Sequence, residues 1–308
     1  MASSWGSQAG AGVAGDRILR ASTPGSANTS TGSRTTPGRD GMAPDVLPPD
    51  LQTHMLNTHG GFSLGRVVIA MTALVLLLVP GADVFAEAPP LTYLSAPETG
   101  KTIRHWDCCK ASGSWPGKAA VFSPVKTCAK DGVTVIDSNT QNVCGGGGGP
   151  GPSYMCSSHQ PWAVDASVSY GFAAARLSGK SESDWLCACY ALKFTSGAAK
   201  GKTFVAQVVD TVAVNAPASY FDLLIPGGGV GVFNGCQSQW SAPSDGWGAR
   251  YGGISSKSEC SKLPSALRPG CNWRFDWLLN ADSPNVTFRR VKCPQEITAK
   301  TGCVRKDG

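Results

Sequence analysis

The sequence has few charged residues and no long apolar run. Of its 308 residues 16% are charged, whereas 38 are glycine and 21 are proline. This composition argues against a coiled coil or a helical bundle. No apolar run reaches the roughly 18 to 20 residues of a membrane-spanning helix, so a polytopic membrane protein is excluded. The basic residues are scattered along the chain, which gives nucleic-acid binding only weak support.

The first part of the chain lacks both cysteine and periodic patterning. Residues 1–64 are rich in Ser, Thr, Gly, Pro and Ala, a composition typical of disorder. Arg66, the apolar run Val67–Val79 and a V-x-A ending indicate a signal peptide over 65–86. Because a signal normally begins near the first residue, we expect the true translation start at Met55 and a secreted, extracellular protein. The alternative, a membrane anchor with a cytoplasmic tail, is disfavoured by the short apolar run.

All twelve cysteines lie after this leader, between Cys108 and Cys303. Their even number and their position favour an oxidising destination and six disulfides. A zinc site would be the alternative, but Cys187 and Cys189 have C-x-C spacing, and only two histidines follow the leader. We therefore expect no metal and no organic cofactor. From residue 87 onward, 22 basic against 16 acidic residues fit a soluble secreted protein.

Residues 87–308 show neither a second domain nor an internal repeat. Short runs rich in β-branched and aromatic residues alternate with turn residues, which predicts an all-β barrel or sandwich with long disulfide-pinned loops. Two stretches, Ser169–Arg176 and Cys260–Leu267, have helical character, and Gly145–Gly149 must be a loop. The expected strands are Ala119–Phe122, Val133–Ile136, Tyr190–Phe194, Thr203–Val209, Val230–Phe233 and Val286–Val291.

Two aspartates have unusual neighbours. Asp107 lies between aromatic residues and two adjacent cysteines, which cannot readily pair with each other and so tie the segment to different parts of the chain. Asp222 lies among apolar side chains, where desolvation favours the protonated form that a general acid needs. One polar and one desolvated carboxyl group are the components of a glycoside hydrolase. The alternative is that either aspartate merely caps a turn.

The sequence resembles the family 45 glycoside hydrolases over Lys101 to Lys306. These are small secreted endo-β-1,4-glucanases. The resemblance implies a six-stranded double-psi β-barrel over 101–306, preceded by a short segment over 87–100, with a cleft across one face. The matching segments, in chain order, are RHWDCCK (104–110), PWAV (161–164), GFAA (171–174), CACY (187–190), FDLLIPGGGVG (221–231), YGGISS (251–256) and PGCNWRFDW (269–277).

The resemblance also implies the chemistry. Asp107 matches the family's general base, which activates water, and Asp222 matches the general acid, which protonates the departing glycosidic oxygen. The mechanism is inverting, for which the two carboxyl groups stand roughly 6.5–9.5 Å apart. The residues that it places at the substrate are His105, Trp106, Trp115, Ala174, Asn215 and Tyr220.

The family usually carries seven disulfides, and this chain lacks the pair at the positions of Gly113 and Leu186. The loss of both halves of one bridge leaves no stranded thiol. The pairing that the resemblance implies is Cys108–Cys236, Cys109–Cys144, Cys128–Cys156, Cys187–Cys303, Cys189–Cys293 and Cys260–Cys271.

The chain also departs from the family motif around the two carboxyl groups. His105 stands where the family has Tyr, Asn215 where it has a second cleft acid, and Tyr220 where His is often found beside the acid. Asp210 compensates for Asn215 if the loop between them folds back. Of the tryptophans outside the cleft, the core is expected to contain Trp162, Trp185, Trp273 and Trp277.

The sequence thus predicts a secreted, monomeric endo-β-1,4-glucanase that acts on cellulose or related β-1,4-glucans, without nucleic acid and without stable membrane insertion. A non-hydrolytic expansin-like wall-binding or wall-loosening protein is the first alternative, but expansins typically lack a counterpart of Asp107. The second alternative is a disulfide-rich secreted interaction protein whose carboxylates no longer work. Only the changes at His105 and Asn215 favour it.

Overall fold

The computed structural model describes residues 87–145, 149–214 and 217–307. The expected leader and signal peptide, Asn215 and most of the glycine run 145–149 lie outside the described residues. Within the described part of the chain, no helix combines the length and the apolar character needed to cross a bilayer.

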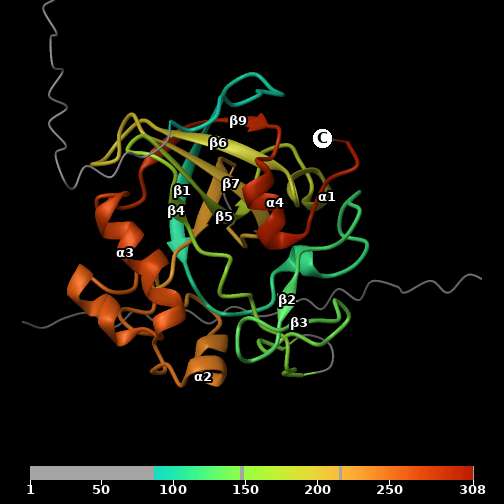
Figure 1. Ribbon diagram of the computed structural model, residues 1–308, viewed down its shortest axis with the longest axis vertical. Coiled ribbons are helices and arrows are strands. Elements are labelled where there is room, and N and C mark those ends of the chain that lie inside the picture. Colours follow the sequence, from blue (N-terminus) through green and yellow to red (C-terminus); the bar gives the residue numbers. More distant parts are fainter. Residues whose placement is uncertain (1–86, 146–148, 215–216, 308) are drawn as a thin grey trace, which may run out of the picture. The chain divides into compact units, whose positions relative to one another are not determined.

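Six strands form a closed barrel, as the sequence predicts (Figure 1). They are hydrogen-bonded in the order β5-β7-β6-β9-β1-β8, and a further pairing between β8 and β5 closes the circle. A short strand, β4, extends the sheet beside β5, and β2 and β3 form a separate hairpin. The bounds are β1 Glu98–His105, β2 Thr127–Cys128, β3 Val135–Ile136, β4 Trp162–Ala163, β5 Val168–Arg176, β6 Cys189–Phe194, β7 Thr203–Thr211, β8 Ser219–Leu224 and β9 Asn285–Val291.

Aromatic side chains fill the inside of the barrel. Tyr190 of β6 lies 5.5 Å from Phe221 of β8 and 5.9 Å from Phe288 of β9, measured between ring centroids. Because β6 and β8 are not neighbours in the sheet, the contact between Tyr190 and Phe221 crosses the interior. Side chains alternate along a strand, so the residues next to these point to the outer face.

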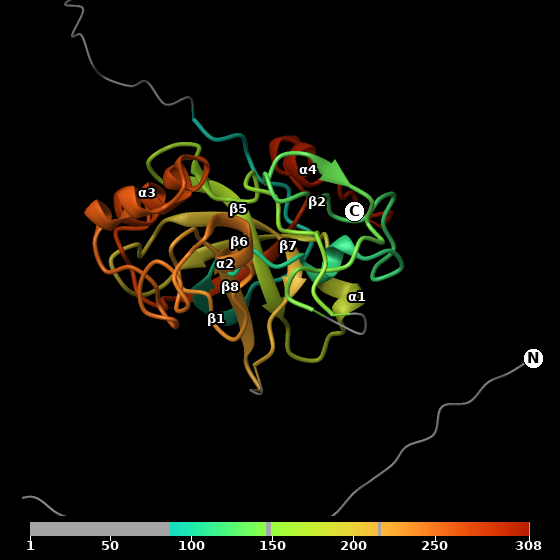
Figure 2. The ribbon, with the colours of Figure 1, turned by 90° about the horizontal axis from the view of Figure 1, so that it is seen from below.

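The helices lie outside the barrel, with α3 and α1 on opposite sides of the strands in Figure 2. Local signals place their ends: the Asn234 side chain accepts a hydrogen bond from Gln237 N at the start of α2, and Gly302, at φ 69°, ends α4. The bounds are α1 Glu182–Trp185, α2 Gly235–Trp240, α3 Arg268–Asp276 and α4 Gln295–Thr301, with 3₁₀ helices η1 Ser112–Ser114, η2 Lys257–Lys262 and η3 Ser265–Leu267.

Three expected elements are wrong and two are partly right; of the expected strand Val133–Ile136, only Val135–Ile136 forms one, β3. Ser169–Arg176 forms strand β5, because this segment is buried on both faces and its apolar residues alternate between the interior and an outer core. Val230–Phe233 is a turn, with Gly231 at φ 62°. Ala119–Phe122 makes only an isolated bridge, Val121 to Arg305. Cys260–Leu267 is helical as two 3₁₀ segments, η2 and η3.

All six disulfides form with the pairing that the family resemblance implies. Gly113 and Leu186, at the place of the missing bridge, are in contact: a Cβ on Gly113 would lie 3.3 Å from Leu186 Cδ2. The leucine side chain occupies the space that a bridge would fill. Trp185, Trp273 and Trp277 are buried as expected, and Trp162 packs half-buried against the core.

Candidate active site

Asp222 lies on the outer face of the barrel, held by strands on both sides. In the sheet it pairs with Ile103 of β1 and with Ala174 of β5. It belongs to the face opposite Phe221 and Leu223, which point into the interior cluster. The side chain is 11% exposed, so the carboxyl group is largely desolvated and still accessible.

Asp210 stands in the same row as Asp222. Ala174 pairs with Asp222 on one side and with Asp210 of β7 on the other, so the three residues share a face across three strands. A bulge at Val209 makes this possible, because Ala173 still pairs with Val208 while Ala174 pairs with Asp210. With two strand spacings between them, the Cα atoms of the two aspartates are roughly 9 to 10 Å apart. The methyl group of Ala174 therefore lies between two carboxylates.

Asp107 follows β1, and hydrogen bonds fix both its side chain and its backbone carbonyl. Its Oδ1 accepts a hydrogen bond from Cys109 N at 2.9 Å, and its carbonyl oxygen accepts one from Cys236 N at 3.1 Å. Cys108 has φ 63°, a conformation unusual for a residue other than glycine, and its disulfide to Cys236 holds it there. The carboxylate is rigidly placed, as the pair of adjacent cysteines predicts.

His105 closes the group. In the parallel pairing of β1 with β8, Ile103 lies opposite Asp222 and His105 opposite Leu224, so His105 and Asp222 are diagonal neighbours on one face. His105 Nδ1 lies 2.9 Å from Asp222 Oδ1, an ion-pair contact at hydrogen-bonding distance. We call His105, Asp107, Asp210 and Asp222 the acidic cluster.

The members of the acidic cluster influence one another's protonation. Burial raises the pKa of Asp107 to about 6, and the carboxylates of Asp210 and Asp222 push it in the same direction. The charge of His105 and the Cys109 N–H act the other way. Burial also raises the pKa of Asp210, although its Oδ1 accepts N–H groups of Ser112 and Thr211, both at 2.8 Å. Two carboxyl groups with raised pKa values around one imidazole are typical of an acid–base site.

The other residues expected at the substrate divide into two groups. Trp106 is 2% exposed and packs in the core, so its ring offers no face to a sugar and that expectation is corrected. Ala174 is 3% exposed, and its visible role is to pair with the two aspartates. Trp115 and Tyr220 are half-buried; Lys110 Nζ lies 3.1 Å from the centroid of the Trp115 ring. The position of Asn215 is not described.

Exposed apolar side chains in two segments that contact the residues beside Asp107 were not singled out from the sequence. Val232 and Phe233 are 73% and 55% exposed in the turn that leads into α2, whose Cys236 is bonded to Cys108. Tyr251 is 72% exposed and forms an isolated β-bridge with Gly229. The Gly229 carbonyl in turn accepts a hydrogen bond from Trp106 N. The signal available in the sequence was the position of Tyr251 at the start of a matching segment. Val232 and Phe233 had been assigned to a strand, which hid their exposure.

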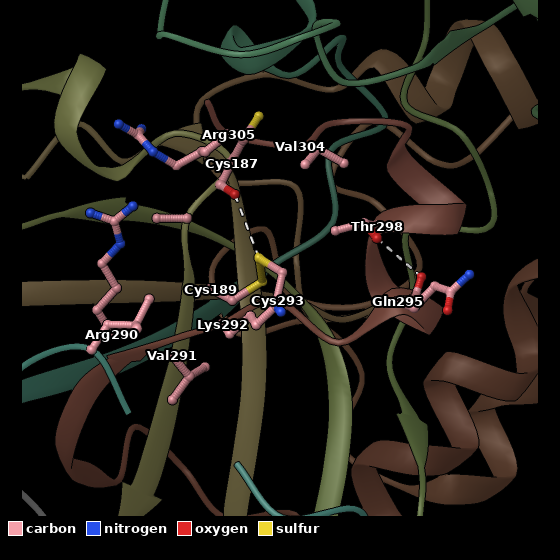
Figure 3. A pocket seen from close by; sticks show the side chains of 12 residues that line it. Cys187, Cys189, Arg290, Val291, Lys292, Cys293, Gln295, Thr298, Val304 and Arg305 are labelled. Atoms are coloured by element: carbon pink, nitrogen blue, oxygen red, sulfur yellow. Dashed lines mark hydrogen bonds between the residues drawn. A yellow bond between two sulfur atoms is a disulfide. The ribbon is translucent and has the colours of Figure 1, made fainter. Parts of the chain in front are cut away.

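A separate pocket of about 170 Å³ opens where the ends of β6 and β9 meet α4 (Figure 3). Its lining includes Arg290, Lys292 and the disulfide of Cys189 with Cys293, and Cys293 Sγ approaches the Cys187 carbonyl within the pocket. None of its lining residues belongs to the acidic cluster. The pocket is therefore not the site that the two aspartates form.

Comparison with known proteins agrees with this site. The family model of glycosyl hydrolase family 45 matches residues 99–304, which include the whole acidic cluster. The chain belongs to this family. The family 45 resemblance seen in the motifs is thereby confirmed.

Relatives of this family 45 chain are similar over the described region. An endoglucanase of Cryptopygus antarcticus is 55% identical over 210 residues, which is 68% of this chain and 91% of that protein. An endoglucanase of Phaedon cochleariae is 40% identical over 208 residues, 66% of this chain and 83% of that protein. The crystal structure of a cellulase from the Antarctic springtail Cryptopygus antarcticus superposes with a TM-score of 0.66 at 54% identity, covering 70% of this chain and 100% of that one.

Proposed function

We propose that this chain is an inverting endo-β-1,4-glucanase that hydrolyses internal β-1,4-glucosidic bonds. The observation that carries the proposal is the acidic cluster itself: Asp107, Asp210 and Asp222 gather around His105 on the outer face of a family 45 barrel. Endoglucanases are the relatives that this chain resembles over most of their length. Nothing in these relatives favours the expansin-like alternative.

Asp107 is the general base in this proposal. Burial raises the pKa of the Asp107 carboxyl group to about 6, so Asp107 is ionised above about pH 6. Because this pKa is close to neutral pH, the carboxylate is a better proton acceptor than an ordinary aspartate. The Cys109 N–H holds one carboxylate oxygen, which leaves the other to take the proton of the attacking water. The water attacks the anomeric carbon from the face opposite the leaving group, and this inverts the configuration.

Asp222 is the general acid. It is largely desolvated between β1 and β5, and it gives its proton to the glycosidic oxygen as the bond between that oxygen and the anomeric carbon breaks. Inversion requires room for one water molecule between acid and base, since the water and the leaving group occupy opposite faces of the sugar.

Aromatic surfaces near the cluster support a polysaccharide substrate. Phe233 and Tyr251 present exposed apolar faces of the kind that pack against pyranose rings. We infer a soluble or cellulosic β-1,4-glucan as the substrate.

We also propose that the protein is secreted as a monomer, with the signal peptide at 65–86 and translation from Met55. Six disulfides among the described cysteines support an oxidising destination. Expression of the full sequence in a secreting host, with N-terminal sequencing of the secreted product, tests this. A product that begins well before residue 87, or that stays inside the cell, contradicts it.

The catalytic assignment is tested with Asp107→Asn and Asp222→Asn. Each should lower the release of reducing ends from carboxymethylcellulose by about 10²–10⁴-fold, because Asn neither accepts nor donates the proton. Asp276→Asn is the matched control, since Asp276 is 55% exposed and pairs with Lys257 on the surface. The product anomer, followed by NMR on a soluble β-1,4-oligomer, should be inverted. Wild-type protein without turnover on any β-1,4-glucan, or a retained anomer, contradicts the proposal.

A further inference from the structure

His105 points at the carboxyl group of Asp222 and not toward an open surface. The two side chains are 16% and 11% exposed, and Nδ1 and Oδ1 are 2.9 Å apart. A side chain so enclosed has little area left for stacking on a sugar. The role of His105 is therefore to be sought in its contact with the acid.

The groups that face His105 come from several elements. Asp222 is on β8, Asp107 follows β1 and Asp210 ends the bulged part of β7; all three carboxylates act on His105. Arg176 of β5 pairs with Tyr220 of β8, which lies two residues before Asp222. Arg176 therefore belongs to the same face of the sheet as Asp222.

Two other cations near His105 along the chain are engaged elsewhere. Arg104 is bonded to Asp282 and to the Gly252 carbonyl. Lys110 donates to the carbonyls of Ser138 and Thr140. The imidazolium form of His105 therefore places a positive charge in direct contact with the acid.

We propose that His105 is the positioning residue of the acid step, and that His105 and Asp222 together hold the one proton that is delivered to the glycosidic oxygen. The proposal rests on the function proposed above. In the resting pair the proton is on the imidazole and Asp222 is a carboxylate; in the reactive pair it is on Asp222 and the imidazole is neutral. Both forms have the same total charge.

The proton balance closes over one turnover. Asp222 gives its proton to the leaving oxygen, the bond from that oxygen to the anomeric carbon breaks, and the leaving sugar gains a hydroxyl group. Water forms the new bond to the anomeric carbon and gives one proton to Asp107. Neutral His105 and ionised Asp222 then recover a proton from solvent, and Asp107 releases one.

The charges around His105 support this arrangement. Burial is the largest influence on the imidazole and acts to lower its pKa, but Asp222, Asp107 and Asp210 together outweigh it and raise the pKa of His105 to about 10. The pair therefore keeps its proton in neutral solution, where an isolated carboxyl group of pKa about 4 has lost it.

The same positive charge helps the base. His105 lowers the pKa of Asp107, whose burial acts in the opposite direction. One imidazolium thus keeps a proton available for the acid and keeps the base ionised, two requirements that normally oppose each other. Removing the charge should narrow the range of active pH from both sides.

The experiment uses His105→Asn. The asparagine amide nitrogen takes the place of Nδ1, but it neither gains nor releases a proton in this pH range. On a soluble β-1,4-gluco-oligosaccharide, the basic limb of kcat/KM should move down by more than one pH unit and the acidic limb should move up. At pH 7 kcat should fall at least tenfold, with KM within about twofold of wild type. A uniform loss at every pH, or a raised KM with unmoved limbs, overturns the proposal in favour of a structural or sugar-binding role.

A second measurement does not depend on turnover. The imidazole nitrogens of His105 are followed by NMR against pH in wild type and in Asp222→Asn. His105 should remain protonated above pH 8 in wild type and should titrate more than one pH unit lower in the variant. Titration near 6.5 in wild type overturns the pair even if the enzyme is active. If the protein is inactive but His105 is still protonated at pH 8, the proposed glucanase function is contradicted while the proton-sharing pair of His105 and Asp222 is not.

Discussion

At the residue scale, backbone N–H groups hold the carboxylates of Asp107 and Asp210, whereas Asp222 contacts the side chain of His105. Asp107 is held through the Cys109 and Cys236 amides, and Asp210 through the amides of Ser112 and Thr211. Backbone donors lower the pKa of a carboxyl group, whereas burial and like charges raise it. For Asp107 burial prevails, and its pKa settles at about 6.

A pH prediction follows from the raised pKa of Asp107. Since the base works only when ionised, kcat/KM should fall about tenfold per pH unit below about pH 6. Asp210 raises the pKa of Asp107, so Asp210→Asn should move this acidic limb to lower pH. Initial rates on a soluble oligomer between pH 4 and 8 measure the acidic limb of the wild type and of the variant. An acidic limb that stays in place, or moves up, would show that Asp210 does not act on the base.

The chemistry of single residues was largely accessible from the sequence. The aspartates and the disulfide pattern carry recognisable motifs, and the pairing that those motifs imply is the one observed. The contact of His105 with Asp222 was not accessible, because it depends on the register between β1 and β8. The burial of Trp106 was not accessible either, because it depends on a long-range contact: Trp106 follows β1, its N–H donates to the Gly229 carbonyl and its ring packs in the core.

Strand β5 is the element that sets the spacing of the cluster. Its residue Ala174 pairs with an aspartate on each side, and the bulge at Val209 turns Asp210 to the same face. The missing seventh bridge lies nearby: a Cβ on Gly113 would be 2.6 Å from the Val209 carbonyl. The glycine thus leaves room for the bulge that presents Asp210.

The size of Ala174 can be tested against its neighbour on the opposite face. Ala174→Val inserts two methyl groups between Asp210 and Asp222, and a displacement near 1 Å should lower kcat about 10²-fold. Ala173→Val instead overpacks the barrel interior and should destabilise the fold by about 1–3 kcal/mol, with the activity of the folded protein retained. Thermal unfolding and kcat of both variants separate the two effects. Equal loss of kcat in both would contradict this division.

The helix expected over Ser169–Arg176 shows where local sequence fails. Three consecutive alanines have high helix propensity, but tertiary packing overrides it. Gly171 is closely covered by Phe204, since a Cβ there would lie 2.6 Å from that ring. Long-range contacts of this kind decide β5, whereas β6, β7 and β9 follow their own β-branched and aromatic pattern and were predicted correctly.

For the whole molecule, the disulfides divide into those that shape the site and those that hold the barrel together elsewhere. Cys108–Cys236 spans 128 residues and directly adjoins Asp107. Cys189–Cys293 spans 104 residues and lines the separate pocket. Loops of these lengths give nearly the same entropic stabilisation, about 5 kcal/mol each in the chain-entropy description.

This match in length allows stability and catalysis to be separated. The double variants Cys108→Ser/Cys236→Ser and Cys189→Ser/Cys293→Ser should lose similar stability in denaturant unfolding, about 5 kcal/mol at most. At a temperature where both remain folded, only the first should lose activity, because Cys108 no longer holds φ 63° and Asp107 is released from its fixed position. Residual kcat on a soluble glucan measures this. If the first variant keeps full activity, the backbone hydrogen bonds at Cys109 and Cys236 alone suffice to place the base.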